Sequence, residues 1–346
     1  MGSDFIIGLT ADYKSQGLDR VESYVQELLA DEPGICYVWL PKMEPAVEAA
    51  VVDQCNAVLS LAIRYTAASF EGLHRLALIA RWGVGYDMID VDACTAAGVA
   101  LAITPNGVRQ PVAEGALTLA LALLKRLPEK DRTVRQGRWR GDLPTFGRTS
   151  TGVTLGSVGL GNIGSEFMRL AGAFHFRRLL AYDPFISPER AAALNVELVD
   201  LDTLLRESDV VAVNCPLSRE TYHLIGEREL SLMKPTAYLV NTARGPIVDQ
   251  AALTKVLQKK GLAGAGLDVL EKEPPDANDP ILELDNVILC PHAIAWSDEL
   301  MYDVTAEACQ ACIDLAHGEL PKAIVNKEVL DNSLFQEKLS RIRGMA

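Results

Sequence analysis

Residues 153–164, Val-Thr-Leu-Gly-Ser-Val-Gly-Leu-Gly-Asn-Ile-Gly, lead an apolar strand directly into a turn that is rich in glycine. Gly159, Gly161 and Gly164 form the pattern GxGxxG. The first glycine allows a tight turn from strand to helix, the second lets the backbone approach a pyrophosphate, and the third lets the helix pack close to the strand. The N–H groups at the start of that helix then face the anion. The stretch predicts a parallel α/β domain that binds a dinucleotide.

A carboxylate follows at the spacing that such a site needs. Asp183 ends the next apolar run, Arg178-Leu-Leu-Ala-Tyr-Asp, and lies 24 positions after Gly159. A carboxylate there accepts hydrogen bonds from a ribose diol and repels a 2′-phosphate. A lone GxGxxG can be a purely structural turn, so the prediction rests on strand, glycines, helix and acid together. They predict NAD(H) as the cofactor.

Length and composition are those of an ordinary two-domain globular chain, with 346 residues, 49% of them apolar and 23% charged. The 33 basic against 46 acidic residues give a net charge of −13, which disfavours nucleic acid and anionic lipid as partners. No apolar run reaches the roughly 18 residues of a membrane span. The first residues show no basic region followed by an apolar stretch, so we expect no secretory signal.

The cysteines indicate the cellular compartment. Seven scattered cysteines do not form a disulfide framework, which favours a reducing, cytoplasmic location. Cys309 and Cys312 form a CxxC, but inside a helical pattern, which favours two buried residues over a redox pair. No second CxxC or histidine pair suggests zinc, and we expect no metal.

Short apolar runs alternate with helical patterns along the chain. Continuous Val, Leu and Ala runs suit strands that are covered on both faces, as in parallel α/β sheets. A long helix, Val112–Leu124, separates two series of strands. We predict strands at Phe5–Thr10, Ile35–Leu40, Ala57–Ala62, Leu76–Ala80 and Val99–Ile103, then at Thr154–Val158, Leu179–Tyr182, Val196–Val199, Val210–Asn214, Ala237–Asn241, Gly264–Val269 and Val287–Leu289.

The domain organisation follows from the place of the glycine motif, because nearly half the chain precedes it. We predict an α/β protein of two Rossmann-like or flavodoxin-like domains, each with a doubly wound parallel sheet. Residues 1–104 plus 298–346 form a discontinuous substrate domain, and residues 105–297 form the NAD-binding domain. A cleft between two domains is a common place for a substrate.

Three strand ends in the second half carry side chains that are suited to acid–base chemistry. Arg244, Glu273 and His292 each follow an apolar run. An arginine offers a planar fork that matches a carboxylate. A carboxylate that bonds an imidazole fixes its tautomer and favours its protonated form, so the ring can exchange protons near neutrality. Singly, the three could be a strand cap, a turn carboxylate and a packed histidine; together they predict convergence beside the nicotinamide.

At this point the chain resembles the D-isomer-specific 2-hydroxyacid dehydrogenase family over nearly its whole length. The step of 29 residues from Arg244 to Glu273 agrees with the family pattern. The segments that carry the resemblance are Arg81–Asp90 (RWGVGYDMID), Pro111–Glu114 (PVAE), Val158–Gly164 (VGLGNIG), Asn214–Leu217 (NCPL), Asn241–Gly245 (NTARG), Leu267–Pro274 (LDVLEKEP) and Cys290–His292 (CPH).

The resemblance implies residue roles. His292 is the general acid and base, Glu273 is its partner, and Arg244 holds the substrate while hydride passes between substrate C2 and the nicotinamide. Val84 and Gly85 contribute backbone donors to the substrate carboxylate. Thr242 and Asp268 orient the nicotinamide. The implied cofactor contacts are Gly159, Gly161, Asn162, Ile163, Gly164, Asp183, Asn214, Cys215, Pro216, Thr242, Ala243, Arg244, Asp268 and His292.

Three residues depart from the family pattern. Arg109 stands where small polar residues are usual, and Arg64 lies in the loop where phosphoglycerate dehydrogenases hold phosphate-binding arginines, although nearer to Arg81 than theirs. Trp296 follows His292 where common subgroups carry small residues or a nearer tryptophan. We expect Arg64, Arg109 and Trp296 to line the substrate site, with an arginine contacting a second polar or anionic group. A surface role for each arginine stays open.

The segment Lys125–Arg148 opposes the acidic trend, with eight basic residues against three acidic ones. A solvated or subunit-contacting arm is favoured over a nucleic-acid site. The resemblance implies a homodimer through residues 112–150.

We therefore predict NAD-dependent interconversion of a D-2-hydroxy acid and its 2-keto acid. Two alternatives stay open, because neither is excluded by the motifs: an NAD(H)-sensing scaffold like the C-terminal-binding corepressors, and oxidation of phosphite or another small acid on the same fold. Formate dehydrogenases are disfavoured, because they resemble this pattern with Gln at the position of Glu273.

Overall fold

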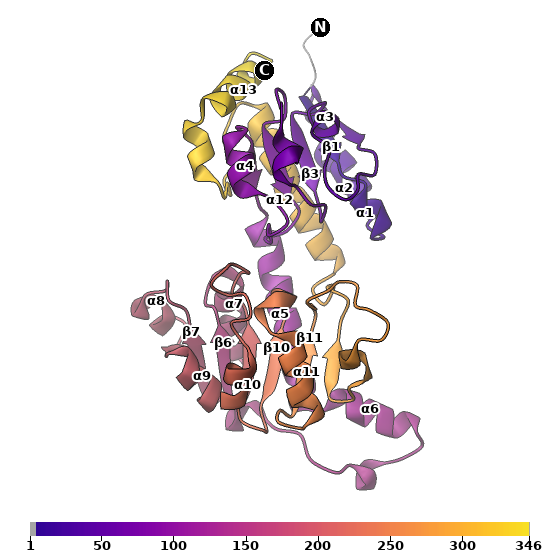
Figure 1. Cartoon of the computed structure of the whole chain (residues 1–346), viewed down its shortest axis with the longest axis vertical. Helices are drawn as coiled ribbons and strands as arrows, with labels where there is room; N and C mark the ends of the chain where they lie inside the picture. The colour runs from indigo at the N-terminus through magenta and orange to yellow at the C-terminus, as the bar shows by residue number, and fades with distance from the viewer. Residues whose placement is uncertain (1–4, 346) are drawn as a thin grey trace. The chain divides into compact units, whose positions relative to one another are not determined.

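The computed structural model describes residues 5–345, which divide into two compact units (Figure 1). Unit 1 comprises Met1–Val108 and Ser297–Ala346, and unit 2 comprises Arg109–Trp296. The two ends of the chain therefore belong to the same unit. The first four residues, which enter the expectation of no secretory signal, lie outside the described part.

Unit 1 is built on a parallel sheet of five strands in the order β2-β1-β3-β4-β5. This is the flavodoxin-like doubly wound order, which reverses direction between β1 and β3. The strands are β1 (Phe5–Leu9), β2 (Ile35–Trp39), β3 (Ala57–Ser60), β4 (Leu78–Arg81) and β5 (Ala100–Ala102). The α-helices are α1 (Asp12–Ser15), α2 (Arg20–Leu28), α3 (Ala49–Val52), α4 (Val91–Ala96), α12 (Asp298–Ala316) and α13 (Ser333–Arg343).

Unit 2 is built on a parallel sheet of seven strands in the order β12-β11-β10-β9-β6-β7-β8. From β8 to β11 this is the doubly wound dinucleotide-binding order, which reverses between β6 and β9. The strands are β6 (Thr154–Val158), β7 (Arg178–Tyr182), β8 (Glu197–Leu198), β9 (Val210–Val213), β10 (Tyr238–Asn241), β11 (Gly264–Leu267) and β12 (Val287–Leu289). The α-helices are α6 (Leu127–Arg135), α7 (Asn162–Gly172), α8 (Pro188–Ala192), α9 (Leu201–Glu207), α10 (Glu227–Leu232) and α11 (Gln250–Gln258).

The predicted fold class is confirmed, and each of the twelve predicted strands is present. The long helix differs from the prediction, because α5 spans Pro105–Leu124 and so begins seven residues before Val112. Proline at the first helical position costs nothing, since the missing N–H has no partner there. The helix also continues through Pro111, which loses one hydrogen bond to the preceding turn. Arg109 and Gln110 consequently lie on a helix.

Apolar side chains fill both faces of the seven-stranded sheet. One core cluster gathers α5, α7 and β6, with Leu117 and Phe167 among its buried residues. The other gathers α9, α10 and α11, with Leu205 and Leu253. Because both faces are covered, the strands can be continuous apolar runs. Figure 1 shows α6 and the loop after it extending from the body of unit 2.

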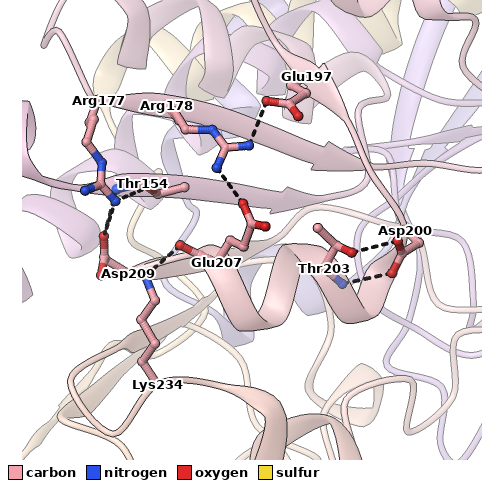
Figure 2. A network of polar contacts seen from close by, with 9 residues as sticks. All are labelled: Thr154, Arg177, Arg178, Glu197, Asp200, Thr203, Glu207, Asp209 and Lys234. Carbon is pink, nitrogen blue, oxygen red and sulfur yellow. Dashed lines mark hydrogen bonds and ion pairs between the residues drawn. The ribbon is translucent and has the colours of Figure 1, made fainter.

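A network of ion pairs joins several strands of unit 2 (Figure 2). Its buried member is Asp209, whose side chain is 5% exposed and lies 3.0 Å from both Arg148 and Lys234, and 3.8 Å from Arg177. Its Oδ2 also accepts the backbone N–H of Thr154 at 2.9 Å. Burial alone raises the pKa of Asp209, but these donors outweigh it and the pKa is lowered.

The cysteines are all free. Cys309 and Cys312 are fully buried within α12, and burial raises the pKa of the Cys309 thiol to about 12. The CxxC is therefore a packed pair and lacks the thiolate that redox exchange requires. No helix within residues 5–345 is long and apolar enough to cross a membrane.

Candidate active site

The glycine turn after β6 has the tight geometry that its sequence predicts. Gly159 adopts φ +99°, and a Cβ there would lie 2.7 Å from the backbone nitrogen of Cys215. A Cβ at Gly164 would lie 2.4 Å from the carbonyl oxygen of Gly159. Side chains are thus excluded at both positions, and α7 begins directly after the turn, at Asn162.

The turn also leaves space where a pyrophosphate needs it. A Cβ at Gly161 would meet no atom within 4 Å, although this residue caps α7. Asp183 is fixed nearby, since its carboxylate accepts the backbone N–H groups of Leu160 at 2.8 Å and Phe185 at 2.9 Å. An open backbone at a helix N-terminus, beside a carboxylate at the end of β7, fits NAD.

Ser157 supports this turn, and the sequence analysis missed it. Its hydroxyl donates to the carbonyl of Gly159 at 2.6 Å and accepts from Nδ2 of Asn214 at 2.9 Å. Oδ1 of Asn214 is buried and has no hydrogen-bond partner within residues 5–345. A polar residue in an apolar strand, two positions before the glycine, was the signal that could have revealed this role.

His292 and Glu273 form a hydrogen-bonded pair, as predicted, with Nδ1 of the imidazole 2.8 Å from Oε2 of the carboxylate. The other carboxylate oxygen accepts the backbone N–H of Leu270 at 3.0 Å. Burial raises the pKa of Glu273, but His292, the Leu270 N–H and the charge of Arg244 outweigh it, so the pKa is lowered. The carboxylate therefore stays ionised beside the imidazole.

The charge of Arg244 acts on Glu273, and the two loops that carry these residues come into close contact. A Cβ at Gly245 would lie 2.0 Å from the carbonyl atoms of Leu270, so only glycine allows this approach. Asn241 braces the turn by donating to the Arg244 carbonyl at 2.9 Å and accepting from the N–H of Ala243 at 3.0 Å. The ends of β10 and β11 are thereby held together.

The backbone at His292 is left-handed, with φ +55°, which is uncommon for a residue other than glycine. Asp268 holds it there: its carbonyl accepts the His292 N–H at 2.8 Å, and Oδ1 accepts the N–H groups of Ala293 at 2.9 Å and Ile294 at 3.1 Å. Burial raises the pKa of Asp268 despite these bonds. Oδ1 of Asp268 thus stabilises the turn that carries the His292 imidazole.

A second histidine–carboxylate pair was not predicted: His223, in the segment after β9, contacts Glu271, in the loop after β11 that also carries Glu273. The His223 N–H donates to the carbonyl of Pro246 at 2.8 Å, one residue after Gly245. The pair therefore ties the segment after β9 to the two loops that carry Arg244 and Glu273. A histidine and a glutamate with no motif around them gave no sequence signal.

The candidate substrate residues are divided between the units. Arg64, Val84 and Gly85 belong to unit 1, whereas Arg109 and Trp296 belong to unit 2. The N–H groups of Val84 and Gly85 have no backbone acceptor within residues 5–345. Arg64 is exposed on the loop after β3, and Ala62 on that loop donates its N–H to Asp12, after β1, at 2.7 Å. This is the point at which the order of the five-stranded sheet reverses.

Residues 117–293 match the family model described as "D-isomer specific 2-hydroxyacid dehydrogenase, NAD binding domain". The chain belongs to this family. A glyoxylate reductase from Korarchaeum cryptofilum is 39% identical over 327 residues, covering 93% of this chain and 96% of that protein. A D-3-phosphoglycerate dehydrogenase from Archaeoglobus fulgidus is 39% identical over 266 residues, 77% of this chain and 50% of that protein.

A solved structure extends the likeness to the fold. The D-lactate dehydrogenase from Aquifex aeolicus, complexed with NAD and lactic acid, superposes with a TM-score of 0.77 at 28% identity, covering 98% of each chain. The match to an NAD-binding domain lies inside unit 2, which carries the glycine turn and Asp183. NAD(H) is the cofactor of this family member.

Proposed function

We propose that this protein reduces a small 2-keto acid to the D-2-hydroxy acid with NADH, and runs the reverse reaction with NAD, in the cytoplasm. The observation that carries the proposal is the hydrogen bond of 2.8 Å between Glu273 and His292, with Arg244 within electrostatic reach of the carboxylate. A positioned acid–base pair beside a guanidinium suits proton exchange on a bound carboxylic acid.

In this mechanism Arg244 binds the substrate carboxylate and orients the reacting oxygen. Glu273 occupies Nδ1 of His292, so Nε2 is left to donate a proton to the carbonyl oxygen in reduction. In oxidation Nε2 takes the proton from the hydroxyl. NADH, when bound, supplies the hydride to C2. Asp268 keeps the imidazole in place, while Thr242 and Asp268 remain proposed contacts of the nicotinamide amide.

The proposed substrate carries a second polar or anionic group, as hydroxypyruvate does. Arg64 supports this, because it is exposed beside the reversal point of the five-stranded sheet, where doubly wound folds bind ligands. Val84 and Gly85, with free backbone donors after β4, would hold the carboxylate. Trp296 is a further candidate for contact with the second group.

We also propose a homodimer through residues 112–150. The segment around α6 exposes Leu127, Val134, Trp139 and Phe146, of which Phe146 is 92% exposed. Apolar side chains gathered in one extended segment are typical of a surface that another chain covers.

A panel of 2-keto acids, assayed with NADH and with NADPH, tests the function. Glyoxylate, hydroxypyruvate, pyruvate and a bulkier keto acid should give steady turnover with at least one member, and NADH should be strongly preferred because of Asp183. His292→Ala should abolish turnover while NADH still binds. Saturable NADH binding without turnover on any substrate would instead favour a scaffold. Phosphite-dependent reduction of NAD would favour the other enzyme.

A further inference from the structure

Arg109 lies beside the helix that receives the cofactor. It is exposed near the start of α5 and makes no hydrogen bond or ion pair with any residue among 5–345. Its neighbour Gln110 accepts a hydrogen bond at 3.5 Å from Arg169 of α7. This contact brings the first turns of α5 alongside α7.

The face of α7 that meets α5 begins at the cofactor turn. Asn162, Glu166 and Arg169 stand at positions i, i+4 and i+7, which places them on one face of the helix. Asn162 is the first helical residue after Gly161, at the anion-binding end. Glu166 follows one turn later, with its side chain only 12% exposed.

A carboxylate one turn from a pyrophosphate would repel it unless positive charge lies close by. Arg169 binds Glu166 directly and lowers its pKa, and Arg109 contributes to the same lowering through its charge. Arg169 is thus committed to Glu166, whereas the donors of Arg109 have no partner among the described residues. The guanidinium of Arg109 is therefore available to bind an anion at this face of α7.

We propose that Arg109 binds the pyrophosphate of NAD(H) and is a cofactor-binding residue of this chain rather than a substrate contact. A guanidinium offers paired donors that match phosphate oxygens. The negative charge of Glu166 attracts the Arg109 guanidinium without a direct contact between the two side chains. This inference rests on the NAD site of the proposed function.

Binding of cofactor fragments tests the assignment without catalysis. The dissociation constants of NADH, ADP-ribose and adenosine are measured by calorimetry for the parent protein, for Arg109→Ala and for Arg206→Ala. Arg206 is a matched control, because it is an exposed arginine of unit 2 that pairs with Asp202 on α9. NADH and ADP-ribose should bind Arg109→Ala at least about tenfold more weakly, as expected for a lost charge-assisted contact. Adenosine binding should not change.

The salt dependence gives a second readout. The slope of log Kd for ADP-ribose against log salt should be smaller for Arg109→Ala than for Arg206→Ala, because one cation–phosphate contact is gone. Unchanged affinity for ADP-ribose would overturn the inference, and so would a raised KM for the keto acid with an unchanged Kd for NADH. If NADH failed to bind the parent protein, the cofactor site itself would be wrong.

Discussion

Two acidic residues fix His292, one through its imidazole ring and the other through its backbone. Glu273 takes Nδ1, and Asp268 fixes the left-handed backbone through three N–H groups. A histidine in this left-handed conformation is less stable than a glycine would be, and the surrounding hydrogen bonds offset that difference. The imidazole is therefore held in position before the substrate arrives.

Replacing Glu273 with Gln should lower kcat by about 100-fold, because the protonated imidazole loses the negative charge that stabilises it. The alkaline limb of kcat/KM for reduction should move to lower pH. The lowered pKa of Glu273 also means that its stabilising contribution is present at neutral pH and is lost as pH falls through the folded-state pKa. Steady-state kinetics across pH measure the first effect. An unshifted pH profile would show that the carboxylate is not the partner in turnover.

The residue scale is where the sequence predicted most. Gly159, Gly164 and Asp183 could be assigned because their chemistry is local: a left-handed turn, a close helix and a carboxylate at a strand end. Ser157 could not be assigned, nor could the role of Asp268 in bonding the turn at His292, since both depend on which backbone groups come within hydrogen-bond reach.

At the scale of elements, the site depends on loops that follow separate strands. The end of β10 meets the loop after β11 at a distance that only Gly245 permits. The pair of His223 and Glu271 ties the segment after β9 to the same place. Strand ends far apart in the sequence are thus brought together by backbone packing as well as by side chains.

Gly245→Ala should strongly reduce kcat while the protein stays folded, because the added Cβ must separate the loops of Arg244 and Glu273. We expect a loss of about 1–3 kcal/mol of unfolding free energy, typical of overpacking. Gly172→Ala is the matched control, since a Cβ there meets no atom within 4 Å. Kinetics and denaturant unfolding measure both variants. Wild-type kcat in Gly245→Ala would refute the close approach.

Asp209→Asn should destabilise unit 2 by about 2 kcal/mol, because a buried carboxylate with charged partners is lost. The lowered pKa of Asp209 contributes stability above its unfolded-state pKa, and this is lost as pH falls through the folded-state value. The stability of the variant should therefore be less sensitive to acid below about pH 4.

Glu197→Gln is the control, because it removes an exposed carboxylate of the same network (Figure 2), and it should cost under about 1 kcal/mol of unfolding free energy. Equal losses in the two variants would contradict the role of burial.

The elements themselves were largely predictable, and the exception is instructive. Runs of Val, Leu and Ala identified the strands because both faces of each sheet are covered. The start of α5 was misplaced because proline usually begins a helix, whereas Pro111 lies inside this one. Packing of the following turns against the unit 2 core outweighs the one lost hydrogen bond.

At the scale of the whole molecule, unit 1 is completed by the last part of the chain. Lys338 of α13 is 3% exposed, and its Nζ donates to the carbonyls of Ala97 at 2.8 Å and Gly98 at 3.3 Å, just after α4. Burial lowers the pKa of Lys338 from 10.5 to about 8. Two segments more than two hundred residues apart are joined by this amine.

The contribution of Lys338 to the stability of the parent protein should rise between pH 8 and pH 10.5, since the unfolded chain binds the Lys338 proton more tightly than the folded one. Lys338→Met should lack this contribution, which amounts to about 2 kcal/mol between pH 7 and pH 9.5. Denaturant midpoints of both proteins at the two pH values measure it. The same pH dependence in parent and variant would show that the amine is not shielded from water.

Unit 1 is built from two separate segments of the chain, and this constrains the order in which it folds during synthesis. Its five strands leave the ribosome first, but α12, which packs against β4 and α2, emerges only after the whole of unit 2. The nascent amino-terminal segment must therefore wait with apolar surface uncovered while the later unit folds, and such surface is what chaperones bind. Translation speed through the codons for residues 109–316 would then govern how long the emerging polypeptide is exposed to aggregation.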